Sequence, residues 1–183
     1  MKIIFDLDET LICNHHNPKS SLDKLDLVYS PRLSDQFHLR PHTREVLEKT
    51  RSMGFAVFLA SFSTKGRVDQ VLRASGISDC FDMIFSRSNL DPCYRDEKTA
   101  TSFNAGEFLL VDDKGIDDKH TQAKLKFFGG DEAVCSDKLL KVSAFDGMET
   151  DTELLSVLQE VNRRLQLADR AGSRSYVALR EEK

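Results

Sequence analysis

A continuous apolar run, FAVFLAS at residues 55–61, constrains the fold of this chain more than any other feature. It lies between two segments of helical character, RPHTREVLEKTRSMG and TKGRVDQVLRASG; the second carries Val68, Val71 and Leu72 at helical spacing. A strand without polar alternation is typical of a parallel sheet buried on both faces. We therefore predict an α/β, Rossmann-like fold in which helices flank a parallel sheet.

Further short runs extend this alternation. Strands are predicted for KIIFDL, FDMIFS and EFLLVDD, and either AVCS or LLKVSAF is expected to add a fifth. An amphipathic final helix is predicted over residues 151–167. The sheet should thus have about five strands.

Chain length suits one domain, which we assign to residues 1–167, with 168–183 as a tail or linker. Residues 13–38 are polar and rich in turn-forming residues, and they separate the first strand from the first helix. So long a connection in a compact domain is usually a flap or lid. We expect a small flap insertion at 13–38, which contains His15 and His16, and no full cap domain.

Composition excludes several classes of function. The net charge of −4 gives no broad basic face for nucleic acid. The most apolar stretch, residues 55–60, is far shorter than the ~20 residues that span a bilayer. With no signal-peptide pattern at the N-terminus, we expect a cytoplasmic domain without membrane contact of its own. A further domain after residue 183, with a targeting role, stays open.

The cysteines do not indicate a bridged or thiol-based protein. There are four, and none forms C-x-x-C or a zinc-like cluster with histidine. No cysteine is followed by arginine six residues later, the spacing of cysteine phosphatases. Free thiols in a reducing compartment are therefore expected.

Paired carboxylates follow two of the predicted strands. Asp6 and Asp8 follow the first strand, and Asp112 and Asp113 end EFLLVDD. Ligands of open parallel sheets gather at the carboxyl ends of the strands, so the four acids converge if these strands are neighbours. A hard divalent cation resolves their repulsion, and ligands that are all oxygen indicate Mg²⁺.

These residue types suit phosphoryl transfer. Asp6 can attack as the nucleophile, while Asp8 handles a proton and offers its backbone carbonyl to the metal. Ser61, at the end of the 55–61 strand, supplies a hydroxyl for the phosphoryl oxygens. Lys98 is the best candidate for the cation that phosphoryl transfer needs, and Arg95 is the alternative.

The order of these motifs resembles the haloacid dehalogenase (HAD) superfamily: DLDET, then Ser61, then Lys98, then Asp112-Asp113. Two groups within it are similar. DLDETL, LRPHTREVLEKT and FDGMETDTELLSVL resemble phosphatases of the RNA polymerase C-terminal domain (CTD). LASFSTKGRVDQVL and FLLVDDKGID resemble magnesium-dependent members that act on phosphotyrosine.

The resemblance implies a tight helical turn and flap after the first strand. It assigns Asp6 as nucleophile, Asp8 as general acid and base, and Asp112 or Asp113 as the acid that completes the Mg²⁺ site. It implies that the phosphate contacts come from Leu7, Ser61, Phe62 and Lys98.

The predicted function is a magnesium-dependent protein phosphatase with an aspartyl-phosphate intermediate. Phosphotyrosine in a protein or peptide is the favoured substrate, because Asp113 replaces the asparagine of the polymerase-tail group and STKGRVDQVL leaves no room for their insert. Phosphoserine or phosphothreonine, or a small metabolite, is the alternative substrate. A phosphopeptide-binding module without turnover is the alternative of a different class.

Overall fold

A five-stranded parallel sheet forms the centre of the protein. The computed structural model describes residues 1–14, 27–28, 37–91, 93, 103, 105–129, 136–148 and 150–181. The strand order is β6-β5-β1-β7-β8, and each adjacent pair is parallel. Their bounds are β1 (Lys2–Phe5), β5 (Ala56–Ala60), β6 (Met83–Phe85), β7 (Phe108–Asp112) and β8 (Leu139–Lys141). This confirms the predicted α/β fold, and the fifth strand comes from LLKVSAF.

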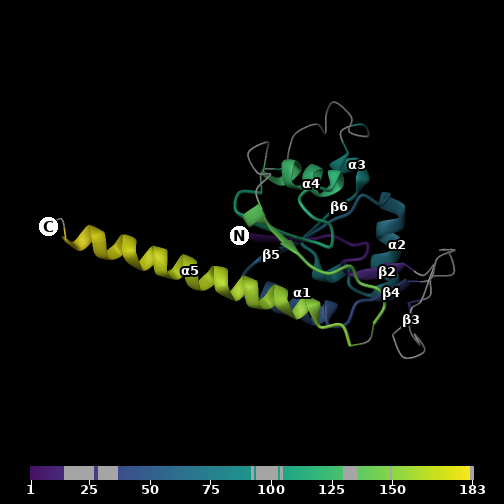
Figure 1. Ribbon diagram of the computed structural model, residues 1–183, viewed down its shortest axis with the longest axis horizontal. Helices are drawn as coiled ribbons and strands as arrows, with labels where there is room; N and C mark the ends of the chain where they lie inside the picture. Colours follow the sequence, from purple (N-terminus) through teal and green to yellow (C-terminus); the bar gives the residue numbers. More distant parts are fainter. Residues whose placement is uncertain are drawn as a thin grey trace.

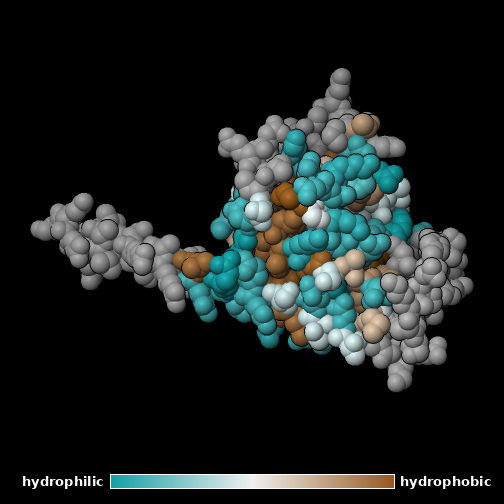
Figure 2. Space-filling view, viewed as in Figure 1, coloured by the Kyte–Doolittle hydropathy of each residue, from teal (hydrophilic) through white to brown (hydrophobic). Residues whose placement is uncertain are grey.

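Helices cover both faces of the sheet (Figure 1). One layer contains α1 (Thr43–Ser52), α2 (Lys65–Ser75) and α5 (Glu153–Glu181), and the other contains α3 (Arg87–Leu90) and α4 (Lys119–Gly129). The described residues also include two 3₁₀ turns, Ser78–Cys80 and Ser136–Lys138. Figure 2 shows a band of apolar side chains across the middle of this view, between hydrophilic surfaces.

Alternate residues of β1 pack into two hydrophobic cores, one on each face of the sheet. Ile3 and Phe5 join the apolar side chains of α1, α2 and α5, whereas Ile4 joins those of α3 and α4. Successive side chains of a strand point to opposite faces, which explains why the strands read as unbroken apolar runs. Burial of both faces therefore fixes the register of the strands and, with it, the residues at their carboxyl ends.

Three helices differ from the sequence predictions. The final helix was expected to end at residue 167, but the backbone of α5 continues to Glu181, so that end was wrong. Neither α3 nor α4 was predicted. The proposed division at residue 167 between domain and tail stays a prediction.

The described parts of the 13–38 insertion lie in a small antiparallel sheet of order β2-β4-β3. Its strands are β2 (Ile12–Asn14), β3 (Leu27–Val28) and β4 (Phe37–Leu39). A tight turn leads into it, because the N–H groups of Leu11 and Ile12 both donate to the carbonyl of Leu7, at 2.9 and 3.1 Å. His15 and His16 lie outside the described residues.

Two observations bear on the composition arguments. Within the described ranges, no helix is both long and apolar enough to cross a membrane. Cys13, Cys80 and Cys93 are free thiols, as predicted. Cys135 is not among the described residues.

A buried arginine ties the turn after β1 to the start of α5. Arg40 is 1% exposed, and its Nη1 donates to the carbonyl oxygen of Thr10 at 3.1 Å. Its Nε and Nη2 donate to the two carboxylate oxygens of Asp151, at 3.1 and 2.8 Å. The guanidinium also lies over the ring of Phe145. Residues more than a hundred positions apart thus hold the turn that carries the first acidic motif.

Asp151→Asn is expected to lower the free energy of unfolding by about 2 to 3 kcal/mol, because it leaves the Arg40 guanidinium buried without a counter-charge. Urea denaturation at pH 7 measures this effect. Asp137→Asn, a change at an exposed acid that forms no ion pair among the described residues, serves as the matched control. Equal loss in both variants would refute the role of the buried pair.

Candidate active site

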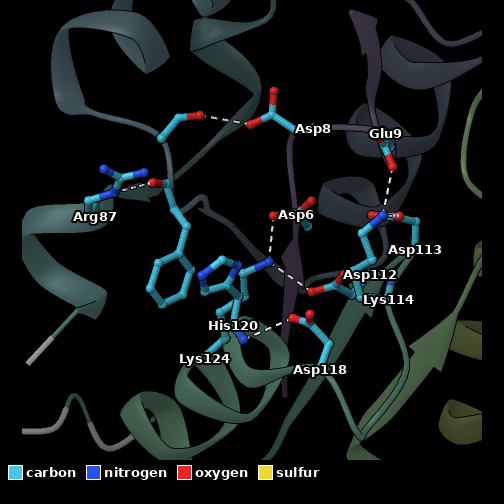
Figure 3. Close-up of a pocket in the computed structure, with 12 residues that line it drawn as sticks. Asp6, Asp8, Glu9, Arg87, Asp112, Asp113, Lys114, Asp118, His120 and Lys124 are labelled. Atoms are coloured by element: carbon cyan, nitrogen blue, oxygen red, sulfur yellow. Dashed lines mark hydrogen bonds and ion pairs between the residues drawn. The ribbon is translucent and has the colours of Figure 1, made fainter.

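Three carboxylates meet where β1 and β7 end. The two strands are hydrogen-bonded neighbours, with Phe5 paired to Val111, so Asp6 and Asp112 lie side by side. Ligand oxygens of Asp6, Asp112 and Asp113 all lie within 4.8 Å of one another, and the three residues are buried. Three of the four acids that were predicted to converge do so, and the side chain of Asp8 does not join them (Figure 3).

A buried lysine from α4 bridges two of these acids. The Nζ of Lys124 lies 2.5 Å from Asp6 Oδ1 and 2.8 Å from Asp112 Oδ2. Burial raises the pKa of Asp6 to about 7, because the lowering effect of Lys124 is the smaller one and the Asp112 charge adds to the rise. Burial disfavours the ammonium of Lys124, but both carboxylates outweigh it and raise the pKa of the lysine. With a pKa of about 7, the Asp6 carboxyl group gains or loses its proton near neutral pH.

Asp113 has the character of a metal ligand. Its Oδ1 accepts a hydrogen bond from Thr10 Oγ1 at 3.2 Å, while its Oδ2 is buried and receives no hydrogen bond of good geometry from the described residues. The Nζ of Lys114 lies 2.7 Å from Oδ2 as an ion pair. Burial raises the pKa of Asp113 even though Lys114 opposes the rise. An oxygen-only donor set with one poorly satisfied oxygen fits a hard divalent cation.

Lys114 competes with any cation that binds Asp113. Its Nζ also contacts Glu9 Oε2 at 2.7 Å, and its side chain is half exposed. Lys114→Gln is expected to tighten Mg²⁺ binding about threefold, because removing a partly screened positive charge favours the divalent ion. Isothermal titration calorimetry measures the change, with Lys119→Gln as the control on α4. Weaker Mg²⁺ binding by Lys114→Gln would contradict this reasoning.

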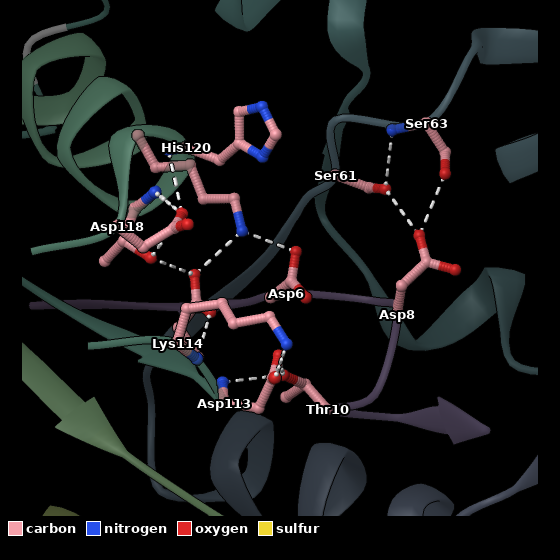
Figure 4. Close-up of polar contacts among 12 residues, drawn as sticks. Asp6, Asp8, Thr10, Ser61, Ser63, Asp113, Lys114, Asp118 and His120 are labelled. Carbon is pink, nitrogen blue, oxygen red and sulfur yellow. Dashed lines mark hydrogen bonds and ion pairs between the residues drawn. The ribbon is translucent and has the colours of Figure 1, made fainter. Parts of the chain in front are cut away.

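Asp8 points away from the three clustered acids (Figure 4). Its Oδ2 accepts hydrogen bonds from Ser63 Oγ at 2.8 Å and Ser61 Oγ at 3.4 Å. Its Oδ1 lies 2.7 Å from Nη1 of Arg67 on α2. The following residue, Glu9, has a φ of 61°, a conformation that is uncommon for residues with a side chain. This turn gives Asp6 and Asp8 different directions, although both line one pocket.

The structure locates several of the predicted substrate-binding residues. Ser61 is fully buried, and its hydroxyl contacts Asp8 and the N–H of Ser63. Leu7 buries its side chain in the core, which leaves only its backbone for a substrate. Phe62 lines the pocket. Lys98 and Arg95 both lie outside the described residues, so each stays a prediction.

The pocket has a volume of about 260 Å³ and a largely charged lining. Sequence reasoning assigned no role to seven of its residues, which are Glu9, Ser63, Arg87, Lys114, Asp118, His120 and Lys124. Lys124 had a recognisable signal, because it occupies the apolar face of KHTQAKLKFF beside the buried Thr121 and Phe128. A lysine on a buried helical face needs a charged partner.

The sheet order and the acids at the ends of β1 and β7 fit the Rossmann-like core of the HAD superfamily. The family model "NLI interacting factor-like phosphatase" matches residues 1–171. The chain belongs to this phosphatase family, which confirms the resemblance to CTD phosphatases.

Two solved structures with TM-scores of 0.50 or more agree on the fold. A HAD-superfamily hydrolase from Ehrlichia chaffeensis has a TM-score of 0.53 at 12% identity, over 88% of this chain and 96% of that one. Fcp1, described as an essential RNA polymerase II CTD phosphatase, has a TM-score of 0.50 at 17% identity, over 91% of this chain and 48% of that one. Fission yeast Fcp1-R271A bound to beryllium fluoride has a TM-score of 0.48 at 16% identity, over 99% of this chain and 55% of that one.

The chain spans about half the length of the two Fcp1 structures. No curated protein matches it.

Proposed function

We propose that this phosphatase is a magnesium-dependent protein phosphatase that forms an aspartyl-phosphate and acts on phosphotyrosine. The observation that carries the proposal is the group of buried acids Asp6, Asp112 and Asp113 with Lys124 against it. Three carboxylates facing two lysines leave a negative charge, which favours a cation over an empty site.

In the proposed first step, a carboxylate oxygen of Asp6 attacks the phosphorus of the ester. A bond forms between this oxygen and phosphorus as the bond from phosphorus to the ester oxygen breaks. Asp8 gives its proton to the departing oxygen. Lys124 Nζ, which contacts Asp6 Oδ1, holds positive charge beside the attacking group.

In the second step, water attacks the phosphorus of the aspartyl-phosphate, and Asp8 takes its proton. Inorganic phosphate leaves and the Asp6 carboxylate is restored. Asp6, Asp112 and Asp113, with the backbone carbonyl of Asp8, would hold Mg²⁺, which when bound neutralises phosphoryl oxygens. Ser61 and the N–H groups of the strand ends are proposed to hold the remaining oxygens, with Lys98 as a second cation.

Two observations support a protein substrate. Fcp1, to which the chain is similar in fold, is described as a CTD phosphatase. The described part of the insertion adds only a small three-stranded sheet, whereas phosphatases of small molecules usually enclose their substrate with a larger cap. Phosphoserine or phosphothreonine is the second candidate, because the family match itself is to CTD-type phosphatases.

Hydrolysis of p-nitrophenyl phosphate tests the chemistry. EDTA is expected to abolish it and Mg²⁺ to restore it; phosphopeptide binding without any turnover would refute the enzyme and favour a binding module. A panel of phosphotyrosine, phosphoserine and phosphothreonine peptides, with a panel of phosphorylated metabolites, then tests the substrate. Higher kcat/KM for metabolites than for any peptide would contradict a protein phosphatase.

A further inference from the structure

Two aromatic rings stack on each other at the edge of the pocket. The ring centroids of Phe62 and His120 are 4.3 Å apart, and the ring planes differ by 24°. Both residues line the pocket that holds Asp6 and Lys124. We call this pair the aromatic wall. It is the aromatic part of a pocket that is otherwise lined by charged side chains and Ser63.

Apolar packing and backbone hydrogen bonds hold Phe62 in place. Its side chain is half-buried and packs against the apolar cluster that includes Phe58 and Phe85. Its carbonyl accepts a hydrogen bond from Arg87 Nε at 2.7 Å, and the N–H of Arg87 donates to the carbonyl of Ser63 at 3.0 Å. Because Phe62 directly follows Ser61, the same short segment carries the buried hydroxyl and the ring.

Helix α4 fixes His120. The backbone N–H of His120 donates to Asp118 Oδ1 at 2.8 Å, which anchors the first turn of the helix. Lys124 follows four residues later, so both side chains lie on the same face of α4. Figure 3 shows the imidazole of His120 on the same side of the pocket as Lys124. One rigid helix therefore carries the cation and the second ring.

We propose that the aromatic wall of Phe62 and His120 determines specificity by binding the aromatic ring of an aryl phosphate ester, as in phosphotyrosine. The inference rests on the proposed function, which puts the phosphoryl group at Asp6. An aryl ring in the mouth of the pocket gains stacking and edge contacts with the wall. The short methylene of phosphoserine has no flat surface to offer, so the wall favours the aryl ester.

Competitive binding of two inert analogues tests this without the difference in leaving groups. Phenylphosphonate and methylphosphonate share the phosphonate group and differ in the ring. In Mg²⁺ buffer, the wild-type protein should bind phenylphosphonate about tenfold more tightly. Phe62→Ala and His120→Ala should each lower this ratio of affinities about threefold or more.

Two further variants make the test decisive. His120→Phe keeps a ring at an exposed helical position and should retain the wild-type ratio. Met83→Ala removes an exposed apolar side chain of β6, outside the pocket lining, and should also retain it. Since His120 is exposed, His120→Ala should fold normally, which circular dichroism checks.

The outcomes separate this inference from the proposed function. A wild-type protein that binds both phosphonates with equal affinity, or alanine variants that keep the ratio, would overturn the role of the wall alone. A similar loss in His120→Phe and His120→Ala would also overturn it. A wild-type protein that binds neither phosphonate and hydrolyses no phosphate ester would refute the proposed function itself.

Discussion

Asp6→Asn is expected to abolish hydrolysis of p-nitrophenyl phosphate while making the metal-free protein more stable at pH 8. The proposed nucleophile is lost, so kcat should fall by about 10⁴-fold or more. Burial, however, disfavours the charged form of Asp6 in the folded protein, which raises its pKa to about 7. An amide of the same size removes the charge and its repulsion from Asp112.

The pH dependence of this stability follows from the pKa. Because the folded-state pKa of Asp6 is about 7 and its ordinary value is 3.8, the folded protein binds a proton that the unfolded chain releases. The contribution of Asp6 to stability is thus complete below its ordinary pKa and is lost as the pH rises through about 7. In EDTA, Asp6→Asn should gain about 1 to 3 kcal/mol over the wild type at pH 8.

Urea denaturation of both proteins across this pH range measures the gain, and Asp69→Asn on α2 is the matched control. If the Asp6→Asn variant still hydrolysed the substrate, Asp6 would not be the nucleophile. Equal stability of variant and wild type at pH 8 would contradict the argument from burial.

Lys124→Met is expected to lower the free energy of unfolding by about 3 to 5 kcal/mol at pH 7, because it leaves two buried carboxylates without their shared cation. Methionine fills most of the same volume, so packing loss adds little. Activity should also fall sharply, since the positive charge beside Asp6 is gone. Urea denaturation and p-nitrophenyl phosphate assays measure the two effects.

Lys119→Met changes an exposed lysine of the same helix and should alter neither quantity by much. Added Mg²⁺ should return part of the lost stability to Lys124→Met, because a cation at the three acids again offsets their charge. A variant as stable as the wild type in EDTA would show that the lysine is not needed to hold these acids.

The convergence of acids was predictable because it follows from strand order and burial. The unbroken apolar runs of KIIF and FLLV required both faces of these strands to be covered. Parallel strands end at the same edge, which brought Asp6 to Asp112 and Asp113 once β1 and β7 were neighbours. The sequence pattern was sufficient for this part of the site.

Lys124 was not predicted because its helix was not. The segment that precedes α4 is dense in charge, and the apolar face of the helix carries a lysine among Thr121, Leu125 and Phe128. In an analysis of periodicity alone, such a lysine interrupts the apolar pattern of the helix. Only the fold shows that two acids from other elements lie within hydrogen-bonding distance of its ammonium.

The direction of Asp8 depends on local backbone geometry that spacing does not encode. Two acids two positions apart suggest side chains on one face of a strand, but β1 ends at Phe5, before both of them. The turn after the strand sends Asp8 towards Ser63 and Arg67. Ser63 thereby enters the pocket, although only Ser61 stood out in the sequence.

Helix α4 carries the ring of His120 and the ammonium of Lys124, and Asp118 caps its first turn. Each residue added to or deleted from this helix would rotate its C-terminal part by about 100° relative to its first turn. A single-codon insertion between His120 and Lys124 would therefore disengage the lysine from both acids while leaving the ring in place. Length changes in this short stretch should therefore be poorly tolerated.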